Sequence, residues 1–140
     1  MKKIAIIIAS HQGLAQALTI HRELPETELF YAGEGQENPC TSINSIPAFV
    51  ATNFTCYEGL VFIGALGICV RSIAPCIHSK YTDPAVVNID STGKHVISVL
   101  SGHVGGANEL TRRLASILGA APVITTQSDN NDLWALDTIH

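Results

Sequence analysis

Runs of consecutive apolar residues alternate along this chain with stretches in which apolar positions recur at helical spacing. The first run, Ile4–Ala9, holds no polar residue and is typical of a strand covered on both faces. Further strands are expected at Leu29–Ala32, Gly59–Gly64, Val86–Asp90, His95–Leu100 and Pro122–Thr125. The helical pattern predicts helices over Leu14–Leu24, Ser42–Asn53, Ala65–Pro75 and Ala107–Leu118. In the first of these helices, Leu14, Leu18 and Ile20 should face inward, and in the second Pro47 weakens the helical pattern.

A short connection between two expected strands sets the direction of part of the sheet. Only Ser91–Lys94 separates Val86–Asp90 from the strand that begins at His95, which is too short for a crossover helix, so these two strands should pair antiparallel. The element order is therefore βαβαβαββαβ. This order predicts an α/β fold, a three-layer α/β/α sandwich with a mostly parallel sheet containing one antiparallel hairpin. We expect residues 1–140 to form a single domain.

Composition narrows the classes of function. The formal net charge of -4, the 6% aromatic content and the absence of a basic run argue against a nucleic-acid partner. The apolar run after Lys2 and Lys3 is too short for a signal peptide or a membrane span, so we expect a cytoplasmic protein without a membrane partner. The four cysteines include no C-x-x-C pair, which predicts free thiols and no metal site.

The segment Ser101–Leu110, with the sequence SGHVGGANEL, joins an expected strand to an amphipathic helix. Its glycines stand at the helix N-terminus, where free backbone N–H groups favour an anion and where a missing Cβ lets a ligand approach. His103 within it is a candidate general base. The segment matches neither the P-loop nor the G-x-G-x-x-G pattern.

A purely structural interpretation of the same segment stays open. Gly105 and Gly106 could form only a tight turn, while Asn108 caps the helix and His103 is hydrogen-bonded and half-buried. Glu109 precedes two arginines at helical contact spacing, so an ion pair with Arg112 or Arg113 could be its whole role. Spacing alone leaves the two interpretations equally supported.

Further polar residues follow other strands, and we expect most of these loops to meet at one edge of the sheet. His11 after the first strand is a second candidate base. Arg71 stands among apolar residues and is expected to be buried, which requires an anion, either a substrate carboxylate or Asp83 or Asp129. Lys80 could bind a carboxylate or simply be solvated. Asp90 lies at the far end of its hairpin and is expected to be structural.

The chain resembles the N-terminal part of the cobalamin-biosynthesis protein G (CbiG) family. The resemblance is dense over residues 59–137 and loose in the first strand. The residues that carry it are Gly64–Ile68, Arg71, Ile73–Pro75, Lys80, Asp83–Val87, Asp90, Val96–Ser98, Ser101–His103, Gly105–Leu110, Pro122–Thr126 and Asp129. Ordered motifs over such a length are far more specific than a lone loop pattern.

The resemblance implies cobalt-precorrin-5A hydrolase in the anaerobic pathway of vitamin B12 synthesis. This activity opens a lactone on the macrocycle and yields cobalt-precorrin-5B and acetaldehyde. The implied ligand is a cobalt-corrinoid rich in carboxylates, with other enzymes of the pathway as partners; the cobalt belongs to the substrate and no cofactor is expected. Family members are more than twice as long, so the chain should correspond to their N-terminal domain.

On this resemblance we assign hypothetical roles to the polar residues. The candidate catalytic residues are His103, His11 and Glu109, with a histidine activating water against the lactone carbonyl. Backbone N–H groups near Gly105 and Gly106 would stabilise the oxyanion. The candidate substrate-binding residues are Arg71, Lys80, Gly102, Gly105, Gly106, Asn108, Thr126 and Asp129. The alternative is a non-catalytic tetrapyrrole-binding or interaction domain that needs a C-terminal partner.

Overall fold

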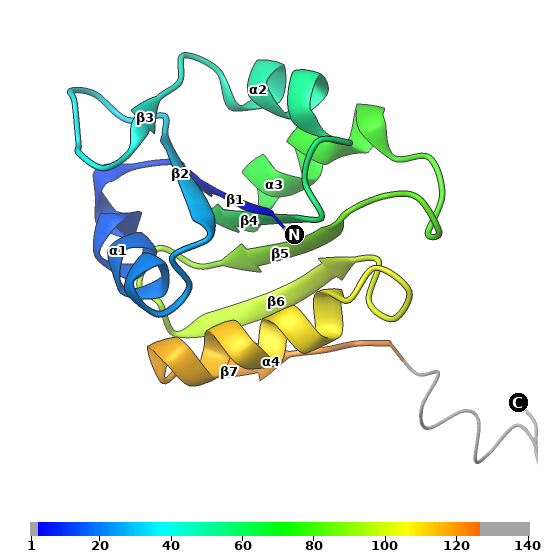
Figure 1. Ribbon diagram of the computed structural model, residues 1–140. Coiled ribbons are helices and arrows are strands. Elements are labelled where there is room, and N and C mark those ends of the chain that lie inside the picture. Colours follow the sequence, from blue (N-terminus) through cyan, green and yellow to red (C-terminus); the bar gives the residue numbers. More distant parts are fainter. Residues whose placement is uncertain (1–2, 127–140) are drawn as a thin grey trace, which may run out of the picture.

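The computed structural model describes residues 3–126, so the predicted substrate-binding residue Asp129 lies outside the described residues. The strands are β1 (Ile4–Ile8), β2 (Thr27–Tyr31), β3 (Thr41–Ser42), β4 (Gly59–Ile63), β5 (Ala85–Ile89), β6 (His95–Leu100) and β7 (Ala121–Val123). The helices are α1 (Leu14–Glu23), α2 (Ile46–Asn53), α3 (Leu66–Ile73) and α4 (Ala107–Leu118), with short 3-10 turns at His11–Gly13 and Ala74–Cys76. These elements build the three-layer α/β/α sandwich that the sequence predicts (Figure 1).

The described strands form one sheet in the order β3-β2-β1-β4-β5-β6-β7. From β3 to β5 all neighbouring strands are parallel. The predicted hairpin is confirmed, because β6 pairs antiparallel with β5, and β7 then pairs parallel with β6. An irregularity between Val86 and Val87 of β5 shifts the register against β6. As a result, β6 and β7 run opposite to the rest of the sheet.

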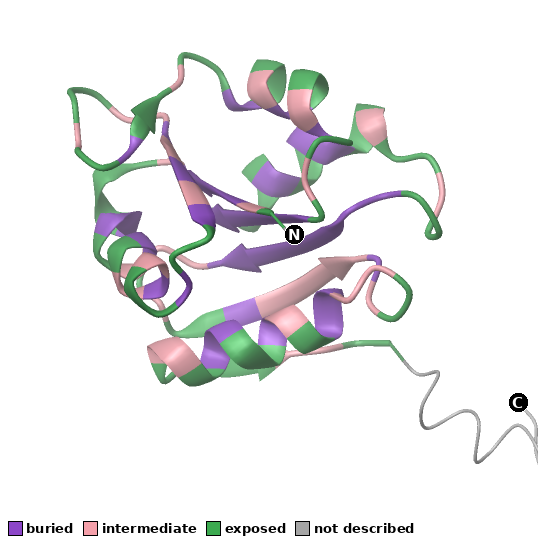
Figure 2. Cartoon of the chain, in the orientation of Figure 1, coloured by how far each residue is buried: buried purple, intermediate pink, exposed green. Residues whose placement is uncertain are grey.

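Two apolar clusters hold the layers together, one on each face of the sheet. Leu14, Ala17 and Ile20 of α1 pack with Leu114 and Ala115 of α4 against one face. The other face is covered by α2 and α3 through a second set of buried side chains: Ile46, Val50, Phe54, Cys69 and Ile73. The central strands β1, β4 and β5 are almost wholly buried, as Figure 2 shows. This burial explains why these strands are continuous apolar runs in the sequence.

Two sequence predictions about helices are wrong in detail. The helix expected from Ser42 begins only at Ile46, because Ser45 caps it by accepting the Ala48 N–H at 3.2 Å and Pro47 occupies its first turn. Residues Thr41–Ser42 instead extend the sheet as β3. Leu18, expected to face inward, is 39% exposed, so α1 packs through a narrower stripe than its apolar residues suggest.

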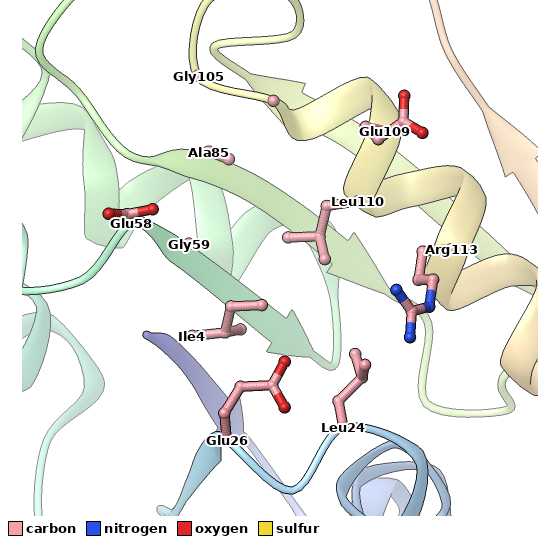
Figure 3. A pocket seen from close by; sticks show the side chains of 11 residues that line it. Ile4, Leu24, Glu26, Glu58, Gly59, Ala85, Gly105, Glu109, Leu110 and Arg113 are labelled. Atoms are coloured by element: carbon pink, nitrogen blue, oxygen red, sulfur yellow. The ribbon is translucent and has the colours of Figure 1, made fainter. Parts of the chain in front are cut away.

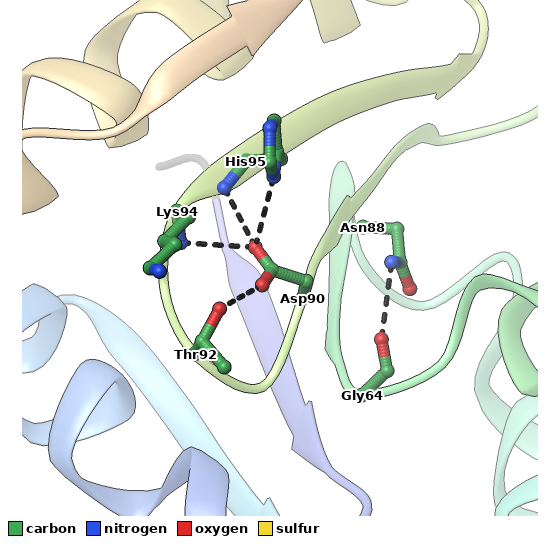
Figure 4. Close-up of polar contacts among 6 residues, drawn as sticks. All are labelled: Gly64, Asn88, Asp90, Thr92, Lys94 and His95. Atoms are coloured by element: carbon green, nitrogen blue, oxygen red, sulfur yellow. Dashed lines mark hydrogen bonds and ion pairs between the residues drawn. The ribbon is translucent and has the colours of Figure 1, made fainter.

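Asp90 holds the turn between β5 and β6, at the edge where β1, β4 and β5 end (Figure 4). Its carboxylate accepts the backbone N–H groups of Lys94 at 2.9 Å and His95 at 2.6 Å, and also the Thr92 hydroxyl. Burial raises the pKa of Asp90, but these hydrogen bonds lower it further than burial raises it, so the net pKa lies below its ordinary value. The predicted structural role of Asp90 agrees with this geometry.

The lowered pKa of Asp90 predicts a pH-dependent contribution to stability. A carboxyl whose pKa is lower in the folded than in the unfolded chain stabilises the fold above the unfolded pKa, and this stabilisation is lost as pH falls through the folded pKa. The free energy of unfolding of the wild type should therefore exceed that of Asp90→Asn at pH 7, and the difference should shrink below about pH 4. Urea denaturation of both proteins from pH 7 to pH 3 measures it. A difference that stays constant across this range contradicts the prediction.

Candidate functional site

The predicted site residues lie at two opposite edges of the sheet. His11 follows the end of β1, beside the ends of β4 and β5. His103 follows the end of β6, where Leu100 pairs with Val86 near the start of β5. The expected convergence of these loops at one edge is therefore wrong, because the hairpin reverses β6 and β7. We call the edge at the start of β1, β4 and β5 the amino edge, and the opposite one the carboxyl edge.

The separation of the two edges rules out one shared reaction centre for both histidines. Residues Ile4–Ile8 of β1 span the distance between them, and four strand steps cover about 13 Å. His11 stands beyond one end of this span and His103 beyond the other. The two side chains cannot both contact one reacting carbonyl. The amino edge instead brings His103 together with Gly102, Gly105, Gly106, Asn108, Glu109 and Thr126.

The loop between β6 and α4 is closed by its own backbone. The carbonyl oxygens of Ser101 and Gly102 accept the N–H groups of Ala107 and Asn108, each at 3.0 Å. Two of the first N–H groups of α4, expected to be free for an anion, are therefore occupied. Ser101 adopts a left-handed backbone with φ 62°, and its hydroxyl donates to the Asp83 carbonyl at 3.3 Å. A strained non-glycine residue held in this way is typical of functional loops.

Each of the three glycines in this loop occupies a position where another residue would be strained or would clash. A Cβ at Gly102 would lie 2.8 Å from Thr126 Cγ2 and 2.9 Å from Asn108 Oδ1, and one at Gly105 would lie 2.5 Å from Ser101 Cβ. At Gly102 and Gly105, the space that a side chain would need is therefore filled by other residues of this chain. Gly106 is the left-handed N-cap of α4 with φ 87°, and nothing lies within 4 Å of its Cβ position. Gly106 is thus the position of the three at which a ligand could approach the backbone.

Asn108 is not a helix cap. It lies inside the first turn of α4, is 5% exposed, and links three neighbouring elements by its side chain. The Ser98 hydroxyl donates to its Oδ1 at 2.7 Å, and its Nδ2 donates to Thr126 Oγ1 at 2.9 Å. Thr126 Oγ1 in turn lies 3.3 Å from Nε2 of the exposed His103. Sequence reasoning missed Ser98, since a serine alternating with apolar residues in a strand carries no functional signal.

A pocket of about 380 Å³ opens at the amino edge under this loop (Figure 3). Its apolar floor consists of Ile4, Leu24, Ala85 and Leu110, and Gly105 and Gly106 form part of its wall. Three carboxylates and one guanidinium line the remainder, contributed by Glu26, Glu58, Glu109 and Arg113. Glu26, Glu58 and Arg113 come from distant segments, so no local motif could predict them. This lining suits an uncharged or cationic group better than a carboxylate.

The cationic residues expected to bind carboxylates are both exposed. Arg71 is not buried as predicted, and among residues 3–126 no carboxylate pairs with it. The Asp83 carboxylate, one expected partner, accepts the N–H groups of His78 at 2.8 Å and Ser79 at 3.1 Å. Lys80 extends from the turn that Asp83 closes, with its Nζ 5.4 Å from the Tyr81 ring. The hydrogen bond from Ser101 joins this turn to the glycine-rich loop.

Of the two ion pairs that the sequence allows, Glu109 forms the one with Arg112, at 3.9 Å. Both partners are more than half exposed, and such pairs contribute little to stability. Arg113 points instead toward the pocket. Glu109 also lines that pocket, so the ion pair does not account for its whole environment.

The carboxyl edge between β1 and β4, where parallel sheets usually bind ligands, is filled by close packing. A Cβ on Gly64 would lie 2.8 Å from the Ala9 Cβ, and one on Gly13 would lie 2.6 Å from Ile63 Cγ2. Asn88 donates to the Gly64 carbonyl at 3.2 Å and fixes this loop further. His11 therefore stands beside a tightly packed corner rather than an open crevice.

Two of the cysteines, Cys40 and Cys69, have a raised pKa and are therefore unsuited to nucleophilic catalysis. All four cysteines are free. Burial raises the pKa of the Cys69 thiol to about 12, and burial followed by the charge of Glu37 raises that of Cys40.

Within residues 3–126, no three His, Cys, Asp or Glu side chains are grouped so that they could hold a metal ion. No helix in this part of the chain is long and apolar enough to cross a bilayer.

The fold and the loop together define a three-layer α/β domain with a glycine-rich strand-to-helix loop at the amino edge of its sheet. Residues 48–129 match the family model described as cobalamin synthesis G N-terminal. The chain belongs to this family, and the predicted resemblance is confirmed.

Known relatives support the same assignment. The chain is 63% identical over 86 residues to a cobalt-precorrin-5A hydrolase of Salmonella typhimurium, which covers 61% of this chain and 24% of that protein. It is 43% identical over 131 residues to the protein of the same name from Priestia megaterium, covering 89% of this chain and 35% of that one. A crystal structure of a cobalamin biosynthesis protein G homologue from Sulfolobus solfataricus superimposes with a TM-score of 0.68 at 30% identity, over 94% of this chain and 40% of that one. The chain thus spans well under half the length of these relatives.

Proposed function

We propose that this chain acts in cobalamin biosynthesis as the N-terminal domain of a cobalt-precorrin-5A hydrolase. The observation that carries the proposal is the 43% identity over 89% of the chain with the Priestia megaterium protein of that name. The reaction is the hydrolytic opening of the cobalt-precorrin-5A lactone in the cytoplasm, giving cobalt-precorrin-5B and acetaldehyde. The cobalt enters with the substrate, and the domain uses no cofactor of its own.

The amino edge supports this chemistry because its parts match different groups of the substrate. A lactone is uncharged, so it fits the pocket whose floor is apolar and whose rim carries carboxylates. The peripheral acetates and propionates stay outside and bind the exposed Lys80 at this edge. Arg71 has no part in this binding, because its guanidinium lies against Gly67 at the start of α3, toward the carboxyl edge. The carbonyl then lies against Gly106, where the backbone is open to a ligand, and its N–H and that of Gly105 stabilise the oxyanion.

His103 is the general base of this proposal. It is exposed on the loop that ends at the pocket, and neutral imidazole can take a proton from water near pH 7. Glu109 on the rim of the same pocket is the second candidate for this role. His11 is excluded from the site by its position at the carboxyl edge.

A second function is favoured by the share of the relatives that the chain covers. The match spans 35% of the Priestia megaterium protein, so the domain could bind the tetrapyrrole or another pathway enzyme while the rest of such a protein supplies the chemistry. Binding needs the same lysine and the same pocket. The two functions differ in whether a product is released.

Anaerobic incubation of the 140-residue chain with cobalt-precorrin-5A distinguishes the two functions. The full-length Priestia megaterium protein is assayed in parallel as the positive control, and both acetaldehyde and the corrinoid absorption spectrum are followed. Acetaldehyde released over many turnovers is the expected result. A spectral change without acetaldehyde supports the binding function instead, and no response of either kind overturns both proposals for this domain.

A further inference from the structure

Of the large hydrophobic side chains in residues 3–126, the two most exposed stand on adjoining turns at the amino edge. Tyr81 is 69% exposed and Val104 is 59% exposed, whereas the other large hydrophobic side chains reach at most 46%. Exposed apolar side chains that gather on one surface beside polar groups mark a ligand or partner site. We propose that Tyr81 and Val104 form an apolar platform that binds the flat face of a tetrapyrrole, while Lys80 binds one of its carboxylates. The identity of this ligand rests on the proposed function.

The turn that carries Tyr81 is fixed by its own hydrogen bonds. The Asp83 carboxylate accepts the N–H groups of His78 at 2.8 Å and Ser79 at 3.1 Å. The Ser79 carbonyl accepts the N–H groups of Thr82 and Asp83, and the Ser79 hydroxyl oxygen accepts the N–H of Tyr81 at 3.1 Å. The backbone under Tyr81 is therefore held while its ring stays in solvent. A side chain presented in this way adds little ordering cost when a ligand binds.

The turn that carries Val104 is attached to the first one. Ser101 Oγ lies 3.3 Å from the Asp83 carbonyl oxygen, and because a carbonyl only accepts, the serine hydroxyl is the donor. Tyr81 stands two positions before Asp83, and Val104 stands three positions after Ser101. Both turns lie at the end of the sheet where β5 begins and β6 ends (Figure 1), and their tips are exposed (Figure 2). The two exposed side chains thus belong to one connected surface.

This surface is continuous with the pocket at the amino edge. Ala85, which closely follows the turn of Tyr81, lines the pocket, and so does Gly105, which directly follows Val104. The pocket volume of about 380 Å³ is near the lower end of the roughly 300–1,000 Å³ that drug-sized ligands occupy. A macrocycle with acetate and propionate arms must therefore lie mostly outside the pocket. The platform supplies the apolar surface for its face, while one edge of the ring system reaches the pocket.

The charges around the platform orient such a ligand. Lys80 is exposed, and its Nζ lies 5.4 Å from the centre of the Tyr81 ring, so a cation stands beside the apolar surface. On the pocket side the charged lining includes the carboxylates of Glu26, Glu58 and Glu109. Carboxylate arms are attracted by the lysine and repelled by the pocket rim. The uncharged side of the ring system is then the one that faces the pocket.

The test measures binding of uroporphyrin, a flat fluorescent tetrapyrrole with acetate and propionate arms, to the 140-residue chain by fluorescence anisotropy. Tyr81→Ala removes the ring, Tyr81→Phe keeps it without the hydroxyl, and Lys80→Gln removes the charge. Val104→Ala shortens the second side chain, whose exposure leaves the packing of its loop independent of it. Val70→Ala is its matched control, because Val70 is 45% exposed on α3, outside both turns. Circular dichroism checks that every variant is folded.

Tyr81→Ala should raise the Kd for uroporphyrin by about 5- to 100-fold, the range expected when a flat ring system loses its aromatic stacking partner. Val104→Ala should raise it by about two- to fivefold, because less apolar surface is covered. Lys80→Gln should raise it by a similar factor at low salt, and by less at about 0.5 M salt. Tyr81→Phe and Val70→Ala should stay within about twofold of the wild type.

Two results overturn the platform: a wild-type chain that does not bind uroporphyrin, and a Tyr81→Ala variant that binds it as tightly as the wild type. Should Tyr81→Ala fail to fold, Tyr81→Leu takes its place, since leucine keeps the apolar bulk and lacks the flat ring. An effect of Val104→Ala no larger than that of Val70→Ala removes Val104 from the platform and contradicts the proposal as stated.

Uroporphyrin binding involves no turnover, so its outcome is separate from that of the hydrolase assay. A chain that binds uroporphyrin through Tyr81 but releases no acetaldehyde overturns the hydrolysis and leaves the platform standing. Release of acetaldehyde by Tyr81→Ala with wild-type kinetics overturns the platform and leaves the hydrolysis standing. When the chain turns over, Tyr81→Ala should raise KM with kcat unchanged, because the platform holds substrate and transition state equally.

Discussion

Replacement of His103 by alanine is expected to slow the release of acetaldehyde from cobalt-precorrin-5A by about 10²–10⁴-fold, the usual contribution of a positioned general base. If the proposed function is right, the loss falls on kcat, because the exposed imidazole then acts in the transition state and lies outside the lining of the pocket. Single-turnover assays under anaerobic conditions, with acetaldehyde as readout, measure the effect.

His11→Ala is the matched comparison, because sequence alone makes the two histidines equal candidates. His11 lies at the opposite edge of the sheet, so its loss should change turnover by no more than about twofold, as expected of an exposed residue away from the site. If His103→Ala retains full activity while Glu109→Gln loses it, Glu109 is the base. If His11→Ala alone abolishes turnover, the site lies at the carboxyl edge and our placement is wrong.

Leu114→Ala is expected to lower the free energy of unfolding by about 2–5 kcal/mol. Leu114 is 1% exposed and packs from α4 into the apolar cluster shared with α1 and the sheet. Its removal takes apolar surface out of that cluster and leaves a cavity that the rigid central strands cannot close. The melting temperature should fall by about 10 °C, which thermal unfolding followed by circular dichroism measures.

The control for this substitution is Leu18→Ala, the same change on another helix. Leu18 is 39% exposed, so its loss should cost less than about 1 kcal/mol. Equal destabilisation by the two variants would mean that Leu114 of α4 does not pack in the apolar cluster as described. Because α4 also carries Asn108 and Glu109, partial unfolding of Leu114→Ala should reduce ligand binding in proportion to the unfolded fraction.

The general architecture could be predicted because its signals are local. Ile4–Ile8 and Gly59–Ile63 are apolar throughout, as expected of strands that helices cover on both faces. The connection after Asp90 is too short for a crossover helix, so it predicts a hairpin. The errors arise where tertiary contacts override the local pattern. Thr41–Ser42 joins the sheet only because it pairs with β2, and the identity of these two residues does not predict that pairing.

The site residues stay predictions, whereas the single edge at which they were expected to meet is wrong. The prediction assumed that every loop after a strand reaches the same edge, although the hairpin it also predicted reverses β6 and β7. Following that reversal would have separated His11 from His103 without any structure. Arg71 is different: its apolar neighbours Ile68 and Val70 are themselves 39% and 45% exposed, so an apolar context did not mean burial. Side-chain partners such as Ser98 require coordinates.

The reversed hairpin also affects how the domain can diversify. The loop that carries His103 follows β6, which a short turn joins to β5. None of the crossover connections between β1, β2, β4 and β5 includes this loop. Changes between β6 and α4 can therefore leave the packing of the parallel part of the sheet intact. Because Gly102, Gly105 and Gly106 each have a structural reason, the exposed Val104 is the position of this loop that selection or library design can vary most freely.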